Sequence, residues 1–333
     1  MKKLLSLALA LCLIIPPGCS QAPKKFSESF QAMDTFMRLD IYGADCTGAI
    51  RDDILSLESR LSAADPDSEL GRVNANGGGE FCADTAELTR RTLALCEETG
   101  GALDITVYPI VEEWGFISKS FHIPDETRLQ ELLKNVGYSR VAMNGSRIEL
   151  PEGCRLDFGA VAKGYAADRA VAQLKKDKAS GAILNLGGTI VAYGKKPGGS
   201  AWSVGIADPE NSADHMGRLS CSDRIIATSG SYERCFEGED GRLYSHIIDP
   251  KTGRPVDNGI LSVTVVSESG LRADALSTAL FVMGVDKAMD FYRESRNFDC
   301  VILTADRRAY VSKGVADSFR TADGHDYKII IIE

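Results

Sequence analysis

The chain has 333 residues and a formal net charge of −9, and 44% of its residues are hydrophobic. This length allows one large domain or two intertwined lobes around a substantial core. The negative charge, together with the lack of a basic stripe in the sequence, argues against nucleic acid as a partner. An acidic protein still binds phosphate-bearing ligands where a metal ion supplies the local positive charge.

A targeting segment is predicted at the N-terminus. Lys2 and Lys3 precede an apolar run over residues 4–15, which is too short to span a bilayer comfortably. The run leads to Gly18-Cys19-Ser20, which resembles a bacterial lipobox, where a cysteine is lipidated after cleavage. Pro16 stands where leucine is usual, so an ordinary secretory signal is the alternative.

Both alternatives predict an exported protein. Lipidation of Cys19 predicts an anchor on the outer face of the cytoplasmic membrane or on the periplasmic side. The predicted boundaries are a signal peptide over residues 1–19, a polar tether over 20–29 and a folded domain over 30–333. Of the nine cysteines, Cys12 leaves with the signal and none forms a Cys-x-x-Cys pair. Isolated buried thiols are therefore the default prediction, and one or two disulfides are the alternative.

The first half of the chain shows alternating strand and helix patterns. Apolar residues alternate along residues 35–42, as in a strand with one buried face. Asp84 and Glu87 form a predicted capping box for a helix that ends at Gly100. The other elements expected here are a helix at 49–61, a turn-rich loop at 65–79, an extended segment at 101–109, a helix at 125–135 and a strand at 146–150.

A glycine-bearing turn opens the next helix, which runs to about residue 176. Free N–H groups and the helix dipole make such a turn a natural anion site, and Lys163 adds a point charge. The spacing differs from that of a P-loop. The alternative is that Asp157 caps the helix and Lys163 is merely solvated.

Strands dominate the second half of the chain. His246 lies in one of them, and a lone strand histidine is more often a satisfied core or surface group than a catalytic one. The expected elements are strands at 183–188, 202–206, 225–227, 244–250, 261–266, 300–304, 309–312 and 327–332, and a helix at 286–296. A cluster of hydroxyls at 228–232 directly follows the third of these strands.

An apolar helix is predicted over residues 271–284, with Gly284 at its C-terminal end. Asp274 and Thr278 lie four residues apart and therefore share one face. A carboxylate and a hydroxyl in a buried segment suit Mg²⁺, which fills its other positions with water and phosphate oxygens. The alternative is that Asp274 caps this helix and Thr278 bonds back to a carbonyl.

Eight short motifs occur along the chain in the order in which one protein family carries them. They are Met33-Asp-Thr35, Gly101-Ala-Leu-Asp104, Trp114-Gly-Phe116, Asp157-Phe-Gly-Ala-Val-Ala-Lys-Gly164, Asn185-Leu-Gly-Gly188, Thr228-Ser-Gly230, His246-Ile-Ile-Asp-Pro250 and Ala273-Asp-Ala-Leu-Ser-Thr278. Together they resemble the ApbE family of FAD:protein FMN transferases, from about Phe30 to the C-terminus. The resemblance implies an α+β fold with two mixed α/β lobes and the nucleotide between them. It also implies that FAD and Mg²⁺ bind, that FMN moves onto a Ser or Thr hydroxyl of a target protein, and that AMP is released.

The resemblance also implies roles for individual residues. The metal ligands would be Asp274, Thr278 and the backbone carbonyl of Ala160. The positions matching flavin-nucleotide contacts are Met33, Ala102, Leu103, Asp104, Asp157, Lys163 and His246.

Two positions depart from the family pattern. Ser62-Ala63-Ala64 replaces a segment in which many relatives carry an aromatic ring, and Thr189 stands where an acidic residue is common. The aromatic candidates for the missing role are Tyr108, Trp114 and Phe116.

The chemistry needs a proton acceptor for the attacking hydroxyl. His246 is the first candidate, because its ordinary pKa of about 6.5 lies near working pH; Asp274 is the competitor. The chain carries no Asp-Gly-Ala-Thr acceptor motif, so the target should be another protein, such as a membrane or exported redox subunit. The alternatives are an FAD pyrophosphatase that uses water and a non-catalytic flavin-binding lipoprotein.

Overall fold

The computed structural model describes residues 22–324 and 326–333. Its largest element is a nine-stranded sheet in the order β1-β2-β6-β7-β10-β15-β16-β17-β19. Neighbouring strands pair antiparallel except for β17 and β19, which are parallel. The strands are β1 (Lys25–Ala32), β2 (Thr35–Tyr42), β6 (Gly181–Leu186), β7 (Thr189–Gly194), β10 (Arg224–Gly230), β15 (Ile260–Ser267), β16 (Asp299–Thr304), β17 (Arg308–Ser312) and β19 (Lys328–Ile332).

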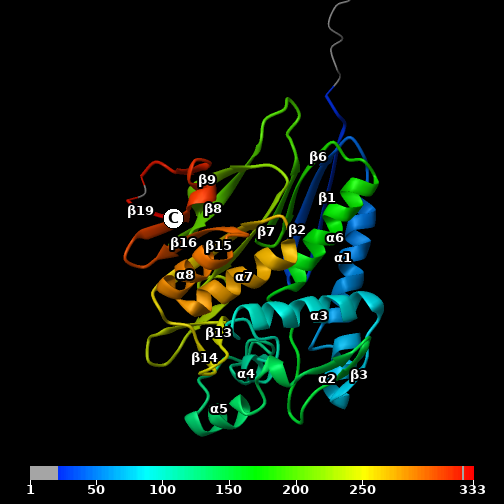
Figure 1. Ribbon diagram of the computed structural model, residues 1–333, viewed down its shortest axis with the longest axis vertical. Coiled ribbons are helices and arrows are strands. Elements are labelled where there is room, and N and C mark those ends of the chain that lie inside the picture. The colour runs from blue at the N-terminus through cyan, green and yellow to red at the C-terminus, as the bar shows by residue number, and fades with distance from the viewer. Residues whose placement is uncertain (1–21, 325) are drawn as a thin grey trace, which may run out of the picture.

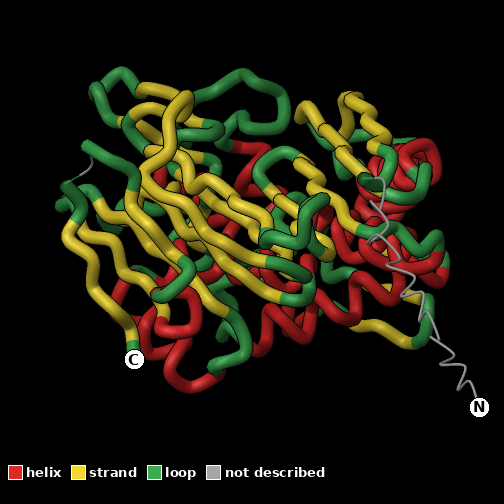
Figure 2. Tube along the Cα trace, turned by 90° about the horizontal axis from the view of Figure 1, so that it is seen from above, coloured by secondary structure: helices red, strands yellow, loops and turns green. Residues whose placement is uncertain are grey.

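The two faces of this sheet are covered differently. Helices gather along one face (Figure 2), and a three-stranded sheet in the order β18-β9-β8 packs on the other. Trp202 and Val204 of the small sheet share a buried apolar cluster with Val301 of the large one. The elements are α1 (Thr47–Leu61), α6 (Ala162–Lys176), α7 (Gly270–Met283), α8 (Val285–Ser295), α9 (Lys313–Ala316), β8 (Trp202–Asp208), β9 (Asn211–Cys221) and β18 (Phe319–Thr321).

A second lobe lies beneath the sheet in Figure 1, around the long helix α3. The hairpins β11–β12 and β13–β14 adjoin it, and the Trp114 indole N–H donates to the Gly253 carbonyl at 2.8 Å. The structure is therefore α+β with two mixed lobes, as predicted. The remaining elements are α2 (Glu69–Asn76), β3 (Gly78–Glu80), α3 (Ala83–Glu98), α4 (Tyr108–Glu113), α5 (Glu126–Leu133), a 3₁₀ helix (Tyr138–Arg140), β4 (Ala142–Asn144), β5 (Arg147–Glu149), β11 (Cys235–Glu237), β12 (Leu243–Ser245), β13 (Ile248–Asp249) and β14 (Arg254–Pro255).

Three local predictions are wrong. The loop expected at 65–79 contains helix α2, because the Ser68 side chain accepts the Gly71 N–H at 2.7 Å and Gly77 ends the helix in the left-handed region. The predicted capping box also fails: α3 begins after Cys82, and its N-cap makes no side-chain hydrogen bond. The segment at 101–109 is a series of turns leading into α4 rather than an extended strand.

The predicted tether is shorter than expected. Residues 25–29 lie in β1 and pair with β2, so the folded domain begins before residue 30. The predicted signal peptide and Cys19 lie outside the described residues. Within residues 22–324 and 326–333, no helix is both long enough and apolar enough to cross a membrane. The seven cysteines of the described chain are all free thiols, as the default predicted, but only Cys46, Cys96, Cys154 and Cys300 are buried.

Candidate functional site

Helices α6 and α7 touch through their backbones, and this crossing positions the centre of the site (Figure 1). A Cβ atom added to Gly164 would lie 2.1 Å from the Gly270 carbonyl oxygen. One added to Gly270 would lie 2.2 Å from the Gly164 carbonyl oxygen. Because neither position can hold a larger side chain without a backbone shift, the two glycines allow an approach that other residues would block.

Asp274 projects from α7 into the first turn of α6. Its buried carboxylate accepts the Gly164 N–H at 2.7 Å, so it caps α6 rather than its own helix. Ser269 caps α7 instead, by accepting the Arg272 N–H. Burial raises the pKa of Asp274, while the Lys163 ammonium and the Gly164 and Lys163 amides lower it. Asp274 forms no ion pair with any residue of the described chain.

Two further oxygens accompany this carboxylate. Because the Gly164 N–H points to Asp274, no hydrogen bond from the described residues reaches the Ala160 carbonyl, four positions earlier. Thr278 lies one turn after Asp274, with its hydroxyl 3.3 Å from that of Ser229. The hydroxyl that bonds back to the Asp274 carbonyl belongs to Ser277, so the back-bonding alternative for Thr278 is wrong.

Two cations lie near these groups. Lys163, in the first turn of α6, has no ion pair within the described chain, and Arg234 has one with the exposed Asp34 at 3.8 Å. Both cations lower the pKa values of Asp157 and Glu233, which burial raises. The site therefore combines desolvated carboxylates with cations that are largely free to bind an anion.

His246 follows β12 and is half-buried. Its Nδ1 lies 3.2 Å from the Arg234 carbonyl, which only accepts, so Nδ1 carries the proton in the neutral ring and Nε2 is left with its lone pair. Burial, together with the charges of Arg234 and Lys163, lowers the pKa of His246 to about 4. At neutral pH the ring is therefore uncharged and the Nε2 lone pair is available, but His246 is a weaker base than its ordinary pKa of about 6.5 predicted.

Comparison with known proteins gives this arrangement a family. A family model described as the ApbE family matches residues 33–302. The chain belongs to the ApbE family. An FAD:protein FMN transferase of Treponema pallidum is 32% identical over 344 aligned positions, covering 95% of each chain. One of Haemophilus influenzae is 30% identical, covering 94% of this chain and 96% of its own.

Solved ApbE structures share the fold. The ApbE protein of Thermotoga maritima superimposes with a TM-score of 0.78 at 30% identity, covering 90% of this chain and 97% of its own. The flavinyl transferase ApbE of Pseudomonas stutzeri, in its apo form, gives a TM-score of 0.77 at 26% identity, covering 86% and 92%. The two-lobed α+β architecture is thus that of ApbE proteins.

Within this ApbE fold, Met33 lies in a turn whose next residue, Asp34, pairs with Arg234. Met33 and Asp34 form the turn between β1 and β2, both with positive φ, and the Met33 N–H donates to Glu58 at 2.6 Å. The ion pair between Asp34 and Arg234 brings this turn to the site. Nucleotide binding by Met33 stays a prediction.

The predicted nucleotide segment 102–104 is joined to the α6 turn through the residue that follows it, Ile105. The Asp157 N–H donates to the Ile105 carbonyl at 2.8 Å, which ties this segment to the α6 turn. The Asp104 carboxylate already accepts hydrogen bonds from Thr106 and from the Tyr138 N–H at 3.0 Å. Any contact with a nucleotide from Ala102, Leu103 and Asp104 is therefore expected mainly from their backbone.

The proposed aromatic substitutes are mostly committed to the core. Trp114 is fully buried, and Tyr108 is buried with the Arg155 guanidinium 4.9 Å from its ring centroid. Phe116 is the one that adjoins the site, with its ring centroid 6.4 Å from that of His246. Ser62 begins the segment that lacks the expected ring. Its carbonyl oxygen accepts a hydrogen bond from the Ser68 hydroxyl at 2.6 Å.

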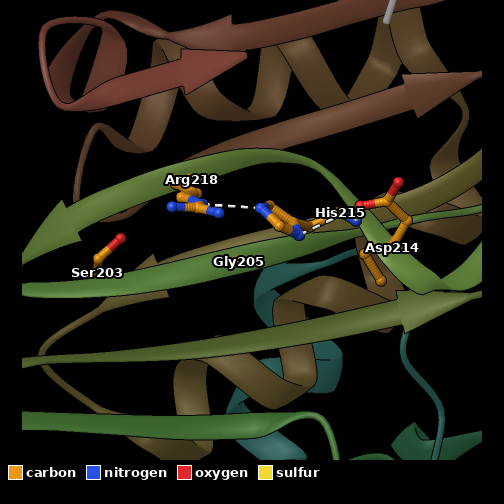
Figure 3. A pocket seen from close by; sticks show the side chains of 6 residues that line it. Ser203, Gly205, Asp214, His215 and Arg218 are labelled. Carbon is orange, nitrogen blue, oxygen red and sulfur yellow. Dashed lines mark hydrogen bonds and ion pairs between the residues drawn. The ribbon is translucent and has the colours of Figure 1, made fainter. Parts of the chain in front are cut away.

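Sequence reasoning missed Glu233 and Arg234. The available signal was their position, a charged pair three residues after the hydroxyl cluster at Thr228-Ser-Gly230. A separate surface hollow of about 480 Å³ lies on β8 and β9 (Figure 3). There Arg218 Nε donates to His215 Nε2 at 2.7 Å. No residue lining this hollow comes from α6 or α7.

Proposed function

We propose that this protein transfers FMN from FAD to a Ser or Thr hydroxyl of another protein and releases AMP. The names of its relatives support FAD as substrate and a protein as acceptor. The observation that carries the proposal is the buried Asp274 carboxylate, which has no ion pair among the described residues and lies near Lys163, whose charge also acts on the neutral His246.

The oxygens near Asp274 fit Mg²⁺. They are one carboxylate, the Thr278 hydroxyl and the Ala160 carbonyl, and Mg²⁺ prefers oxygen ligands with few carboxylates and several positions left for water and phosphate. No group of three or more Asp, Glu, His or Cys side chains suited to a metal occurs among the described residues, so the substrate phosphates would complete the shell. When bound, Mg²⁺ would neutralise charge on the pyrophosphate and orient it.

The protein residues divide the remaining work. Lys163 and Arg234 bind the phosphate oxygens and hold the pyrophosphate for in-line attack. His246 Nε2 takes the proton from the acceptor hydroxyl. The hydroxyl oxygen forms a bond to the FMN phosphorus, the bond from that phosphorus to the bridging oxygen breaks, and AMP leaves with the bridging oxygen. Asp274 stays an anionic ligand, which leaves His246 as the base.

We further propose that the protein is exported and lipid-anchored at Cys19, and that its acceptor is a membrane or exported redox subunit. The N-terminal sequence pattern supports this location. An acceptor in the same compartment follows from it.

The test is to incubate the protein with FAD, MgCl₂ and the exported protein fraction of its source organism. Covalent flavin fluorescence in a denaturing gel, with mass spectrometry of the labelled band, is the expected result. Free FMN and AMP without labelled protein would instead indicate a pyrophosphatase. Bound FAD that stays intact would indicate a non-catalytic binder. Omitting MgCl₂ is the control for the metal.

A further inference from the structure

Asp168 lies on α6, one turn beyond Gly164, and holds the start of the neighbouring helix. Its carboxylate accepts the Gly270 N–H, the Leu271 N–H at 3.1 Å and the Ser269 hydroxyl at 3.1 Å. These groups form the N-terminus of α7, whose first amides have no partner within their own helix. One side chain of α6 therefore satisfies three donors of α7.

The arrangement is reciprocal. Asp274 of α7 accepts the Gly164 N–H at the start of α6, while Asp168 of α6 accepts amides at the start of α7. The crossing glycines, Gly164 and Gly270, are themselves donors in these two caps, and their backbones are in contact. A rotation or slide of α7 along α6 would break both sets of hydrogen bonds at once. The direction in which Asp274 points is therefore coupled to Asp168.

Asp168 is also tied to the second lobe. Arg91 of α3 has its guanidinium 3.7 Å from the Asp168 carboxylate, and the Asp168 side chain is 21% exposed. An Arg272–Glu98 ion pair joins α7 to the same helix, with a contact of 2.8 Å. Both contacts favour one placement of the α7 start relative to α3 and α6.

We propose that Asp168 is a positioning residue for the metal carboxylate: it fixes the register of α7 on α6 and thereby aims Asp274 and Thr278 at the cation. This inference rests on the metal site of the proposed function. Residues that orient metal ligands through hydrogen bonds typically change metal affinity by about 10- to 100-fold when replaced. Asp168→Asn keeps the size of the side chain but places an NH₂ group against N–H donors.

The test measures binding of Mn²⁺, as a probe for Mg²⁺, by isothermal titration calorimetry with ADP present. Asp168→Asn is expected to weaken Mn²⁺ binding about 10- to 100-fold. Ser269→Ala, which removes one of the three donors, is expected to weaken it a few-fold. FAD affinity without metal should be unchanged in both. The matched control is Asp53→Asn, which breaks the ion pair of Asp53 with Arg169 on α6, away from the α7 start.

Wild-type Mn²⁺ affinity in folded Asp168→Asn protein would overturn the inference, even if its melting temperature fell. Equal weakening in Asp53→Asn would overturn it as well, because general loosening of α6 would then explain the result. If Asp168→Asn does not fold, Ser269→Ala becomes the deciding variant. Wild-type Mn²⁺ affinity in folded Ser269→Ala protein would then overturn the inference. Failure of the wild type to bind Mn²⁺ would overturn the metal site itself, a result distinct from a failure confined to Asp168.

Discussion

His246 presents a free nitrogen to the site while its other ring nitrogen is held by the Arg234 carbonyl. His246→Asn keeps a donor toward that carbonyl but removes the basic nitrogen. We expect FMN transfer to slow by about 10²- to 10⁴-fold, the usual range for a lost general base, with FAD affinity within a few-fold of wild type. His122→Asn, at an exposed histidine that lies 3.9 Å from Glu113, is the control. A defect confined to FAD binding would reassign His246 to nucleotide recognition.

The pH dependence of transfer should report the same residue. Burial and two nearby cations lower the pKa of His246 to about 4, and the base must be uncharged to act. Values of kcat/KM, which reflect the free enzyme, should therefore stay level from pH 8 to about pH 5 and fall below it. Arg234→Met removes one cation and should move this acid limb to higher pH. A limb near 6.5 that Arg234→Met leaves in place would contradict the assignment.

Asp274 has two separable roles, as an acceptor for the α6 amide and as the proposed charged ligand. Asp274→Asn keeps an acceptor for the Gly164 N–H, whereas Asp274→Ala removes it and should cost about 1 kcal/mol of unfolding free energy, as for a lost cap. Both variants should fold, and in both Mg²⁺ should no longer tighten FAD binding or cause AMP release. Calorimetric melting and chromatography of AMP test this. Wild-type AMP release from folded Asp274→Asn protein would refute the metal assignment.

For single residues, the sequence predicted the site where the spacing along one helix or strand decides which side chains lie together. Asp274 and Thr278 share a helix face because they lie four residues apart on α7. Asp168 and Arg234 were not predicted, because each acts across elements distant in the sequence. The partners of Asp168 lie about a hundred positions away, and no local pattern encodes that contact.

Among the elements, the contact between α6 and α7 is the most constrained. Gly270→Ala would place a methyl group 2.2 Å from a backbone oxygen, so the helices must separate. We expect a loss of about 1–3 kcal/mol of unfolding free energy, as for overpacked cores, together with weakened Mg²⁺ binding. Gly48→Ala in α1 is the matched control. Its added methyl group would have a flexible Arg51 nitrogen at 3.8 Å as its nearest neighbour.

Denaturant unfolding of the two alanine variants tests this prediction. Gly48→Ala should be neutral or stabilising, because alanine favours helix over glycine. Equal stability of Gly270→Ala and wild type would show that the helices adjust without cost.

The elements that sequence predicted well were long and regularly patterned. Strand β2 and helix α5, which is capped by Asp125, were confirmed. Helix α2 was missed because Pro66 and three glycines favoured a loop, although Gly77 is the left-handed residue that ends this helix. The segment 101–109 was read as extended because it mixes buried apolar residues with Asp104. That carboxylate is itself buried and holds a turn.

For the whole molecule, the two lobes were expected from a family resemblance rather than from periodicity. Alternating strands and helices are compatible with several architectures. The sheet order places β6 and β7 between β2 and β10, a pairing of distant segments that local patterns do not specify.

We expect the N-terminal segment to decide in which cellular fraction the protein is found. If Cys19 is lipidated, Cys19→Ser should move the protein from the membrane fraction to the soluble exported fraction without changing its specific activity. Fractionation followed by immunoblotting tests this. Unchanged membrane association would show that the lipobox interpretation is wrong.

Four of the free thiols are buried, and their burial decides how reactive they are. Burial raises the pKa values of Cys46 and Cys154 to about 11 and those of Cys96 and Cys300 to about 12. The thiolate is the species that attacks disulfides and reacts with oxidants. Neutral pH lies about four or more units below the pKa values of these four thiols, so they stay protonated and are nearly inert. The folded core therefore protects these four thiols, whereas Cys82 is exposed at the surface.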